Sequence, residues 1–206
     1  MRPTCVIGIL DTPRGVDIGD ELIQSFQEDY FIIPVVHNGS RFEYPAIKCA
    51  LEESVRINGP VLYIHTKGAG NSNPALSKSD EIKYIGPECC PPEGVSILDW
   101  QKTVRKMWKA EFVNHKDWYL NTCNTNEPVV AAPYISPQKH TWTNGFMFNP
   151  AAAKLVYPLK FNPNRWSYEK LWNGTKCNCI GRVYDNMIGY PAMYKWKADV
   201  WSHYND

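Results

Sequence analysis

The chain has 206 residues and a formal net charge of +1, and 44% of its residues are hydrophobic and 21% charged. This length suits one well-buried domain, and the near-neutral balance indicates neither disorder nor a surface that coats a polyanion. No apolar run reaches the roughly 18 residues that a membrane span requires, and the N-terminus lacks a signal-peptide cleavage pattern. We therefore expect a soluble, cytoplasmic protein with no nucleic-acid partner and no membrane span.

The cysteines indicate a reducing compartment. The chain has seven of them, and neither Cys89-Cys90 nor Cys177-x-Cys179 has the CxxC spacing of a structural zinc site. We expect these thiols to be free.

The first third of the chain alternates strand and helix patterns. A buried strand is predicted from Thr4 to Leu10, and it stops at the polar loop Asp11-Thr-Pro-Arg14-Gly, which is typical of the opening of a nucleotide-binding α/β unit. A helix is predicted from about 19 to 29, with one apolar face formed by Leu22, Ile23 and Phe26.

A second strand is predicted from Tyr30 to His37, and Pro34 within it favours an edge strand or a bulge. The strand ends in the turn His37-Asn38-Gly39. The next helix, predicted from 45 to 56, closes at Asn58-Gly59 and is expected to turn four apolar residues inward: Ile47, Ala50, Leu51 and Val55.

The segment from Pro60 to Asn71 carries the clearest functional signal. Its apolar, β-branched and aromatic run predicts a buried strand, which ends in His65, Thr66 and Lys67. Open α/β sheets bind ligands at the carboxyl ends of their strands, the glycines that follow let the backbone approach a ligand, and Lys67 brings a mobile positive charge. We expect an anionic ligand here, most simply a phosphate or diphosphate.

Three strand ends, at Asp11, Asn38 and His65, are expected to converge on one side of a parallel sheet. The chain has neither GxGxxG nor GxxxxGK[ST]. This argues against a dinucleotide oxidoreductase and a P-loop NTPase.

The middle of the chain predicts a long irregular loop from Gly68 to about Gly94, a length typical of lids and binding loops. A helix from Ser96 to about Asn114 follows, and Arg105 is expected to be a solvated charge away from its apolar side. That side is predicted to contain Trp100, Val104, Met107, Trp108 and Phe112.

The second half is less periodic, with strands predicted at 129–135 and 146–148 and helices at 151–156 and 164–172. The polar segment from His140 to Gly145 precedes the second of these strands. It can place hydroxyl, amide and backbone groups against a sugar. Alternatively, it can form a tight turn whose polar groups form hydrogen bonds only with the backbone.

Taken in order, these features resemble a glycosyltransferase of the GT-A type, in particular a group of bacterial and viral polysaccharide-synthesis proteins whose central strand ends in Y-[ILF]-H-T-K-G. The likeness extends from Thr4 to Tyr204. The matching positions are Tyr63 to Gly68, the helix with Trp100, Arg105 and Met107, the segment His140 to Phe148, and Glu169 with Trp172.

The resemblance implies an α/β, Rossmann-like GT-A domain over residues 1–206, with a central, mostly parallel mixed sheet flanked by helices. Residues 1–70 would form a nucleotide-binding half and residues 71–206 an acceptor-binding half. Because the chain stops directly after His203-Tyr204, we also expect covalently linked further domains, and a location in the host cytoplasm if the protein is viral.

By the same resemblance, the base and ribose of a UDP-sugar would be held by Leu10, Asp11, Thr12, Arg14 and Asn38. The acceptor would be bound by His140, Trp142, Thr143, Asn144 and Gly145.

His65, Thr66, Lys67 and Gly68 would occupy the place where most GT-A enzymes carry Asp-x-Asp, the motif that holds Mn²⁺ or Mg²⁺. No Asp-x-Asp occurs in this chain. Either a metal is held by other ligands, with His65, Asp80 and His203 as candidates, or cations replace it.

The implied reaction moves a hexose or deoxyhexose from a UDP-sugar to a glycan acceptor, with retention as in the similar proteins. Lys67, backbone amides near Gly68 and any metal would stabilise the charge on the departing phosphate. An inverting enzyme also needs a carboxylate base. The candidate acids are Asp80, Asp99, Glu169 and Asp185, of which Asp80 and Glu169, with Lys67, are the expected catalytic residues.

Two other functions remain open at this point. One is a non-catalytic nucleotide- or carbohydrate-binding module of a larger glycan-synthesis protein, which the missing acidic pair favours. The other is a hydrolase that acts on nucleotide sugars.

Overall fold

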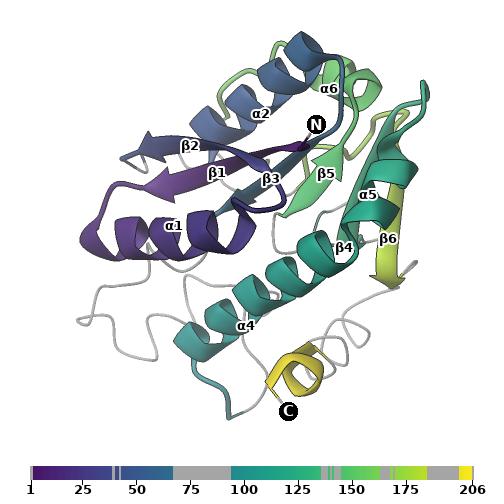
Figure 1. The fold of residues 1–206 in the computed structure, drawn as a ribbon. Helices are drawn as coiled ribbons and strands as arrows, with labels where there is room; N and C mark the ends of the chain where they lie inside the picture. Colours follow the sequence, from purple (N-terminus) through teal and green to yellow (C-terminus); the bar gives the residue numbers. More distant parts are fainter. Residues whose placement is uncertain are drawn as a thin grey trace.

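The computed structural model describes residues 2–38, 40–41, 43–66, 94–135, 139, 141, 145–162, 168, 170–184 and 200–205. These residues form an α/β fold in which a mixed sheet of six strands lies between helices (Figure 1). The arrangement is consistent with a Rossmann-like fold and agrees with the predicted class.

The strands follow the spatial order β2-β1-β3-β5-β4-β6. β1 pairs in parallel with β2 on one side and β3 on the other, and β4 pairs in parallel with β6, whereas β5 is antiparallel to both of its neighbours. β2 lies at one edge of the sheet, as Pro34 predicts. The strand bounds are β1 Thr4–Leu10, β2 Phe31–His37, β3 Val61–His65, β4 Val129–Tyr134, β5 Phe146–Phe148 and β6 Asn178–Tyr184.

Helices cover both faces of this sheet. α1 and α4 pack on one face and α2 and α6 on the other, and each face has its own hydrophobic cluster. Successive side chains of β1 point to opposite faces of the sheet and so contribute to both clusters: Cys5 and Ile7 face α1 and α4, whereas Val6 faces α2. The helix bounds are α1 Pro13–Phe26, α2 Tyr44–Ile57, α4 Ile97–Lys109, α5 Lys116–Cys123 and α6 Pro150–Val156, and residues 200–205 are also helical.

Local chemistry explains why α1 starts six residues before the predicted position. The hydroxyl of Thr12 accepts a hydrogen bond from the backbone N–H of Gly15 at 3.0 Å, and Pro13 occupies the first turn. α2 ends as predicted, at Asn58 in the left-handed conformation with φ 49°.

The helix predicted from Ser96 to Asn114 is broken into parts. α4 ends at Lys109, a π-helical turn covers Ala110–Asn114, and α5 follows. Neither α5 nor β6 was predicted, and the described residues from 168 to 175 form turns rather than the expected helix. The apolar stripe itself is confirmed, since all five of its residues are buried.

The described residues bear on two broader expectations, which concern membrane spans and cysteines. No helix among them is long and apolar enough to cross a membrane. Their five cysteines are all free, as predicted.

Candidate functional site

The carboxyl ends of β1, β2 and β3 lie side by side, and hydrogen bonds join the segments that leave them. The N–H of Asp11 donates to the carbonyl of His37, and the N–H of Thr66 donates to the carbonyl of Gly8, both at 2.8 Å. The hydroxyl of Thr66 accepts from the N–H of Leu10 at 3.0 Å. The predicted convergence of strand ends is therefore confirmed.

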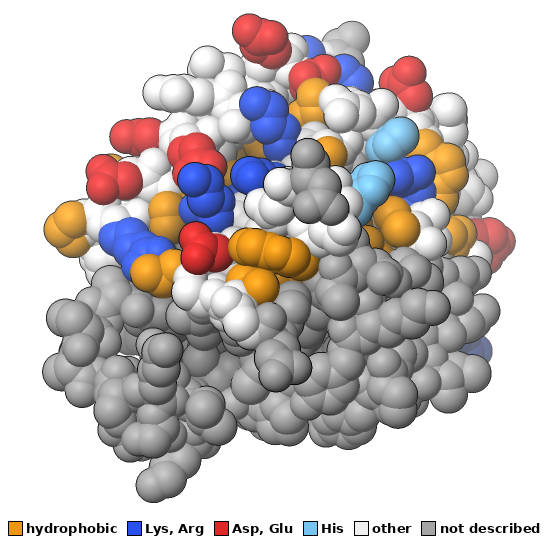
Figure 2. All heavy atoms as spheres, turned by 90° about the horizontal axis from the view of Figure 1, so that it is seen from below, with side chains coloured by type: hydrophobic (Ala, Val, Ile, Leu, Met, Phe, Trp, Pro, Cys, Tyr) orange, Lys and Arg blue, Asp and Glu red, His pale blue; other side chains and the backbone are white. Residues whose placement is uncertain are grey.

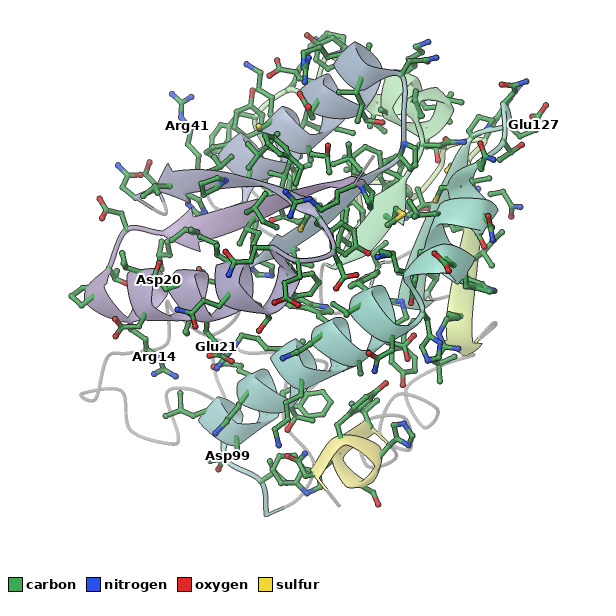
Figure 3. The ribbon with its side chains drawn as sticks, viewed as in Figure 1. Arg14, Asp20, Glu21, Arg41, Asp99 and Glu127 are labelled. Atoms are coloured by element: carbon green, nitrogen blue, oxygen red, sulfur yellow. The ribbon has the colours of Figure 1, made fainter. Side chains whose placement is uncertain are left out.

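The N-terminus of α1 opens at this edge of the sheet. The unpaired N–H groups of a helix start carry partial positive charge and bind anions, and α1 follows β1 after only two residues. Arg14 lies in this first turn, and Figure 3 shows Arg14 and Glu21 projecting from α1 on the side that faces α4.

Arg105 meets this group from α4. Its side chain is only 8% exposed, and its Nε lies 3.7 Å from Oε2 of Glu21. The expectation of a solvated charge was wrong, because this flank of α4 packs beside α1. Burial lowers the pKa of Arg105, Glu21 acts in the opposite direction, and Arg14 adds to the lowering. The Arg105 guanidinium is thus buried between α4 and α1, with the Glu21 carboxylate beside it.

This positive charge is local. In the view from below, Lys and Arg side chains lie among Asp and Glu side chains over the described part of the face (Figure 2). A surface of mixed sign suits a small anionic ligand better than a long polyanion.

A second polar group surrounds Glu43, which precedes α2. Its Oε1 lies 3.9 Å from Nδ1 of His65. Its Oε2 is buried and has no hydrogen-bond partner among the described residues, and the same is true of the Tyr63 hydroxyl and of Nδ1 of His37. Buried polar atoms nearly always have partners. Glu43 and His37 are therefore candidate ligand contacts, whereas the Tyr63 side chain is fully buried.

The Glu43 carboxylate also affects the pKa values of two of its neighbours. Burial raises the pKa of Tyr63, and the nearby Glu43 carboxylate raises it further. Burial lowers the pKa of His37, with Glu43 acting in the opposite direction. Both shifts show that Glu43 lies close enough to influence its neighbours through a poorly solvated medium.

His65 also contacts the other face of the sheet. Its ring centroid lies 5.6 Å from that of Trp108. This approach depends on Gly145, because a Cβ there would lie 2.3 Å from Nε1 of Trp108. Gly145, predicted to bind the acceptor, is thus also a packing residue beside the site.

The predicted site residues have different locations. Leu10, Asp11, Thr12, Arg14, Asn38, His65 and Thr66 lie at or beside the strand ends. Asp99 instead lies in the first turn of α4, where Ser96 is the N-cap: Oγ of Ser96 accepts from the backbone N–H of Asp99 at 3.1 Å, and the Ser96 hydroxyl donates to the Asp99 carboxylate at 2.6 Å. The residues outside the described part are Lys67, Gly68, Asp80, His140, Trp142, Thr143, Asn144, Glu169 and Asp185.

The described residues do not by themselves fit a metal ion. None of their His, Cys, Asp and Glu side chains gather in threes around a common point. His65 and Glu43 approach one another, whereas His203 is exposed in the C-terminal helix. Asp80 lies outside the described part, so the metal site remains a prediction.

Three residues that the structure adds to this region carry little functional signal in the sequence. Arg105 belongs to a helix that carries the resemblance, but its own position beside the apolar stripe does not predict burial, and Glu43 and His37 have no motif. The available signal was position, since Glu43 and His37 lie in or beside the loop that leaves β2, where Asn38 was already suspected.

Comparisons of the chain with protein-family models, with curated proteins and with solved structures give no match.

Proposed function

We propose that the protein is a glycosyltransferase that binds a UDP-sugar at the carboxyl ends of β1, β2 and β3 and transfers a hexose or deoxyhexose to a glycan acceptor. The observation that carries the proposal is the meeting of three parallel strand ends with the start of α1 and a buried arginine, Arg105. Open α/β sheets bind nucleotides in this position.

The diphosphate would lie at the start of α1. Backbone N–H groups there, together with Arg14 and Lys67, supply positive charge, and Arg105 on α4 adds to this charge. As the bond from the sugar to the diphosphate breaks, negative charge grows on the departing phosphate. Fixed dipoles and cations stabilise that charge without having to reorganise.

The nucleoside would lie towards β2. The Glu43 carboxylate and Nδ1 of His37 are two strong acceptors, which suit ribose hydroxyls or a base N–H group. Asn38 is exposed, and its Oδ1 already accepts from the N–H of Ser40 at 3.0 Å. Its amide NH₂ therefore remains as the group that can donate to a base carbonyl.

The sugar would then pass to a hydroxyl of the acceptor, whose proton goes to the departing phosphate if configuration is retained, or to a carboxylate such as Asp80 or Glu169 if it is inverted. His140, Trp142, Thr143 and Asn144 are the proposed acceptor contacts. Mn²⁺ or Mg²⁺, if bound, would add charge stabilisation at the diphosphate.

Calorimetric titration of UDP, first with Mn²⁺ and then with chelator, tests the proposal. Arg14→Gln should weaken binding roughly tenfold, the cost of one charged hydrogen bond, and Lys67→Ala should weaken it further. Lys109→Gln, which changes an exposed lysine at the far end of α4, is the matched control and should bind as wild type.

The titration separates three outcomes. Binding that needs Mn²⁺ favours a metal-assisted site, whereas metal-independent binding that still needs Lys67 means that cations replace the acidic pair. An absence of UDP binding in both conditions would overturn the proposal.

Turnover distinguishes the enzyme from a binding module. The proposed transferase should consume a UDP-hexose faster when a glycan acceptor is present. Binding without any turnover would favour the non-catalytic module, and sugar release at a rate independent of acceptor would favour a hydrolase.

A further inference from the structure

The segment that leads into β6 contains two cysteines that are unrelated to the proposed sugar site. Cys177 is buried and Cys179 is half-buried, and each thiol donates to a backbone carbonyl, Cys177 to that of Asn178 at 3.7 Å and Cys179 to that of Cys177 at 3.9 Å. Because Cys177 and Cys179 are two residues apart in nearly extended chain, their side chains emerge on the same face.

A lysine is anchored next to this pair. Lys139 adopts the left-handed conformation with φ 61°, which is uncommon for a residue with a side chain. Its ammonium donates to the carbonyl oxygens of Thr175 at 2.6 Å and Cys177 at 2.8 Å. These bonds hold a positive charge close to both sulfur atoms.

We propose that Cys177 and Cys179 form a reversible disulfide, which makes the start of β6 a modification site that reacts with small-molecule disulfides such as glutathione disulfide. Two residues of extended chain place Cα atoms roughly 6.6 Å apart, within the upper part of the Cα range of a disulfide, and the chain must bend locally to bring the Cβ atoms to roughly 3.5–4.5 Å. β6 pairs only with β4 among the described strands, so its first residues can adjust.

The two thiols have different parts in the reaction. The neighbouring Cys177 thiol lowers the pKa of Cys179 and burial opposes this, with Lys139 adding to the lowering, whereas the Cys179 thiol and burial raise the pKa of Cys177. Cys179 is therefore the thiolate that attacks, and it is also the more accessible sulfur.

The exchange balances without any other reactant. The Cys179 thiolate attacks one sulfur of glutathione disulfide, forms a mixed disulfide and releases one glutathione thiolate. Cys177 then loses its proton to solvent, attacks the Cys179 sulfur and releases the second glutathione thiolate. The protein loses two electrons and two protons, and one glutathione disulfide becomes two glutathione molecules.

Peptide mass analysis tests this directly. Trypsin cleaves after Lys176 and Arg182 and so releases the peptide CNCIGR, which contains only these two cysteines. After incubation with glutathione disulfide, the peptide should be lighter by two hydrogens and resist alkylation, and reduction should restore both properties. Cys49, in its own peptide, is the internal reference and should gain at most a glutathione adduct.

Variants distinguish the two thiols. Cys177→Ser should retain a stable glutathione adduct on Cys179, whereas Cys179→Ser should react several-fold more slowly than wild type. Lys139→Gln should slow the wild-type reaction several-fold, Lys139→Arg should restore it, and Lys154→Gln, on α6, should have no effect.

Several results would overturn the proposal. These are alkylation of both cysteines after incubation, a stable glutathione adduct in wild type, or a bridge from either cysteine to Cys89 or Cys90.

Discussion

Gly15 is the residue on which the start of α1 most depends. A Cβ at this position would lie 1.9 Å from the carbonyl oxygen of Leu10 and 3.0 Å from Oγ1 of Thr12. A backbone carbonyl cannot move aside as a flexible side chain can. The turn that carries Leu10, Asp11 and Thr12 to the proposed ligand therefore requires glycine here.

We predict that Gly15→Ala lowers the free energy of unfolding by more than about 3 kcal/mol, although helix propensity alone favours alanine by about 1 kcal/mol. Urea unfolding followed by circular dichroism measures this. Gly19→Ala is the control, because its Cβ would meet the side chain of Ile9 at 2.8 Å rather than backbone, and it should cost less. Equal stability of wild type and Gly15→Ala would contradict this account of the turn.

The burial of His37 predicts that the free energy of unfolding depends on pH. Burial lowers its pKa in the folded state, so the unfolded chain takes up this proton at a higher pH than the folded chain does. Stability should be complete above the ordinary pKa of about 6.5 and should fall as the pH decreases towards the folded value. Urea midpoints measured from about pH 7.5 to about pH 5.5 follow the change.

His37→Gln should flatten this part of the pH profile. Glu43→Gln should preserve or steepen it, because the carboxylate that opposes the lowering is removed. A His37→Gln profile that matches wild type would show that other groups cause the loss.

At the scale of elements, the π-helical turn Ala110–Asn114 matters because it presents Glu111. This carboxylate is only 2% exposed, and it accepts hydrogen bonds from Arg182 in β6, Tyr119 in α5 and Tyr204 in the C-terminal helix. One buried charge thus joins four elements. π-helical turns often occur where a side chain has a particular task.

We predict that Arg182→Met lowers the free energy of unfolding by about 3 kcal/mol, because it leaves the buried Glu111 charge without its counter-ion. Tyr204→Phe removes one hydrogen bond and should cost about 1 kcal/mol. Combining Arg182→Met with Glu111→Leu should recover much of the loss, as measured by urea unfolding. If the double variant is less stable than Arg182→Met alone, the uncompensated charge is not the cause.

At the scale of the molecule, the sequence predicts the parallel half of the sheet better than the rest. Continuous apolar runs and helical spacing in the sequence predict β1, β2, β3 and the helices beside them. Hydrogen bonds at Asp11 and Thr66 confirm where the ends of the three strands meet. Local pattern suffices here because β1 and β3 are buried along almost their whole length and the helices beside them have clear apolar faces.

The other half depends on contacts between distant residues. β6 contains Gly181 and Arg182, which a strand pattern does not favour, and the partner that accommodates Arg182 is Glu111, 71 positions away. α5 escapes detection because the π-helical turn shifts the helical phase. Arg105 was misjudged for a similar reason, since its burial depends on α1 rather than on its own helix.

The proposed ligand site joins several elements, so binding there should affect the stability of the whole molecule. A ligand that bridges β1, β2, β3 and α1 binds only the folded state and should therefore stabilise the entire chain. UDP at about one hundred times its Kd would contribute about 2.7 kcal/mol, a rise in Tm of roughly 5–10 °C for a chain of this length. Thermal unfolding with increasing UDP measures it.

Arg14→Gln provides the test within the same experiment, because weaker binding should shift the dependence of Tm on UDP to roughly tenfold higher concentrations. The Tm of this variant without UDP should stay close to that of wild type, since Arg14 is only half-buried and its loss leaves Glu21 beside Arg105. Identical UDP dependence in both proteins would place the ligand away from α1. The strand ends would then be a structural junction rather than the binding site.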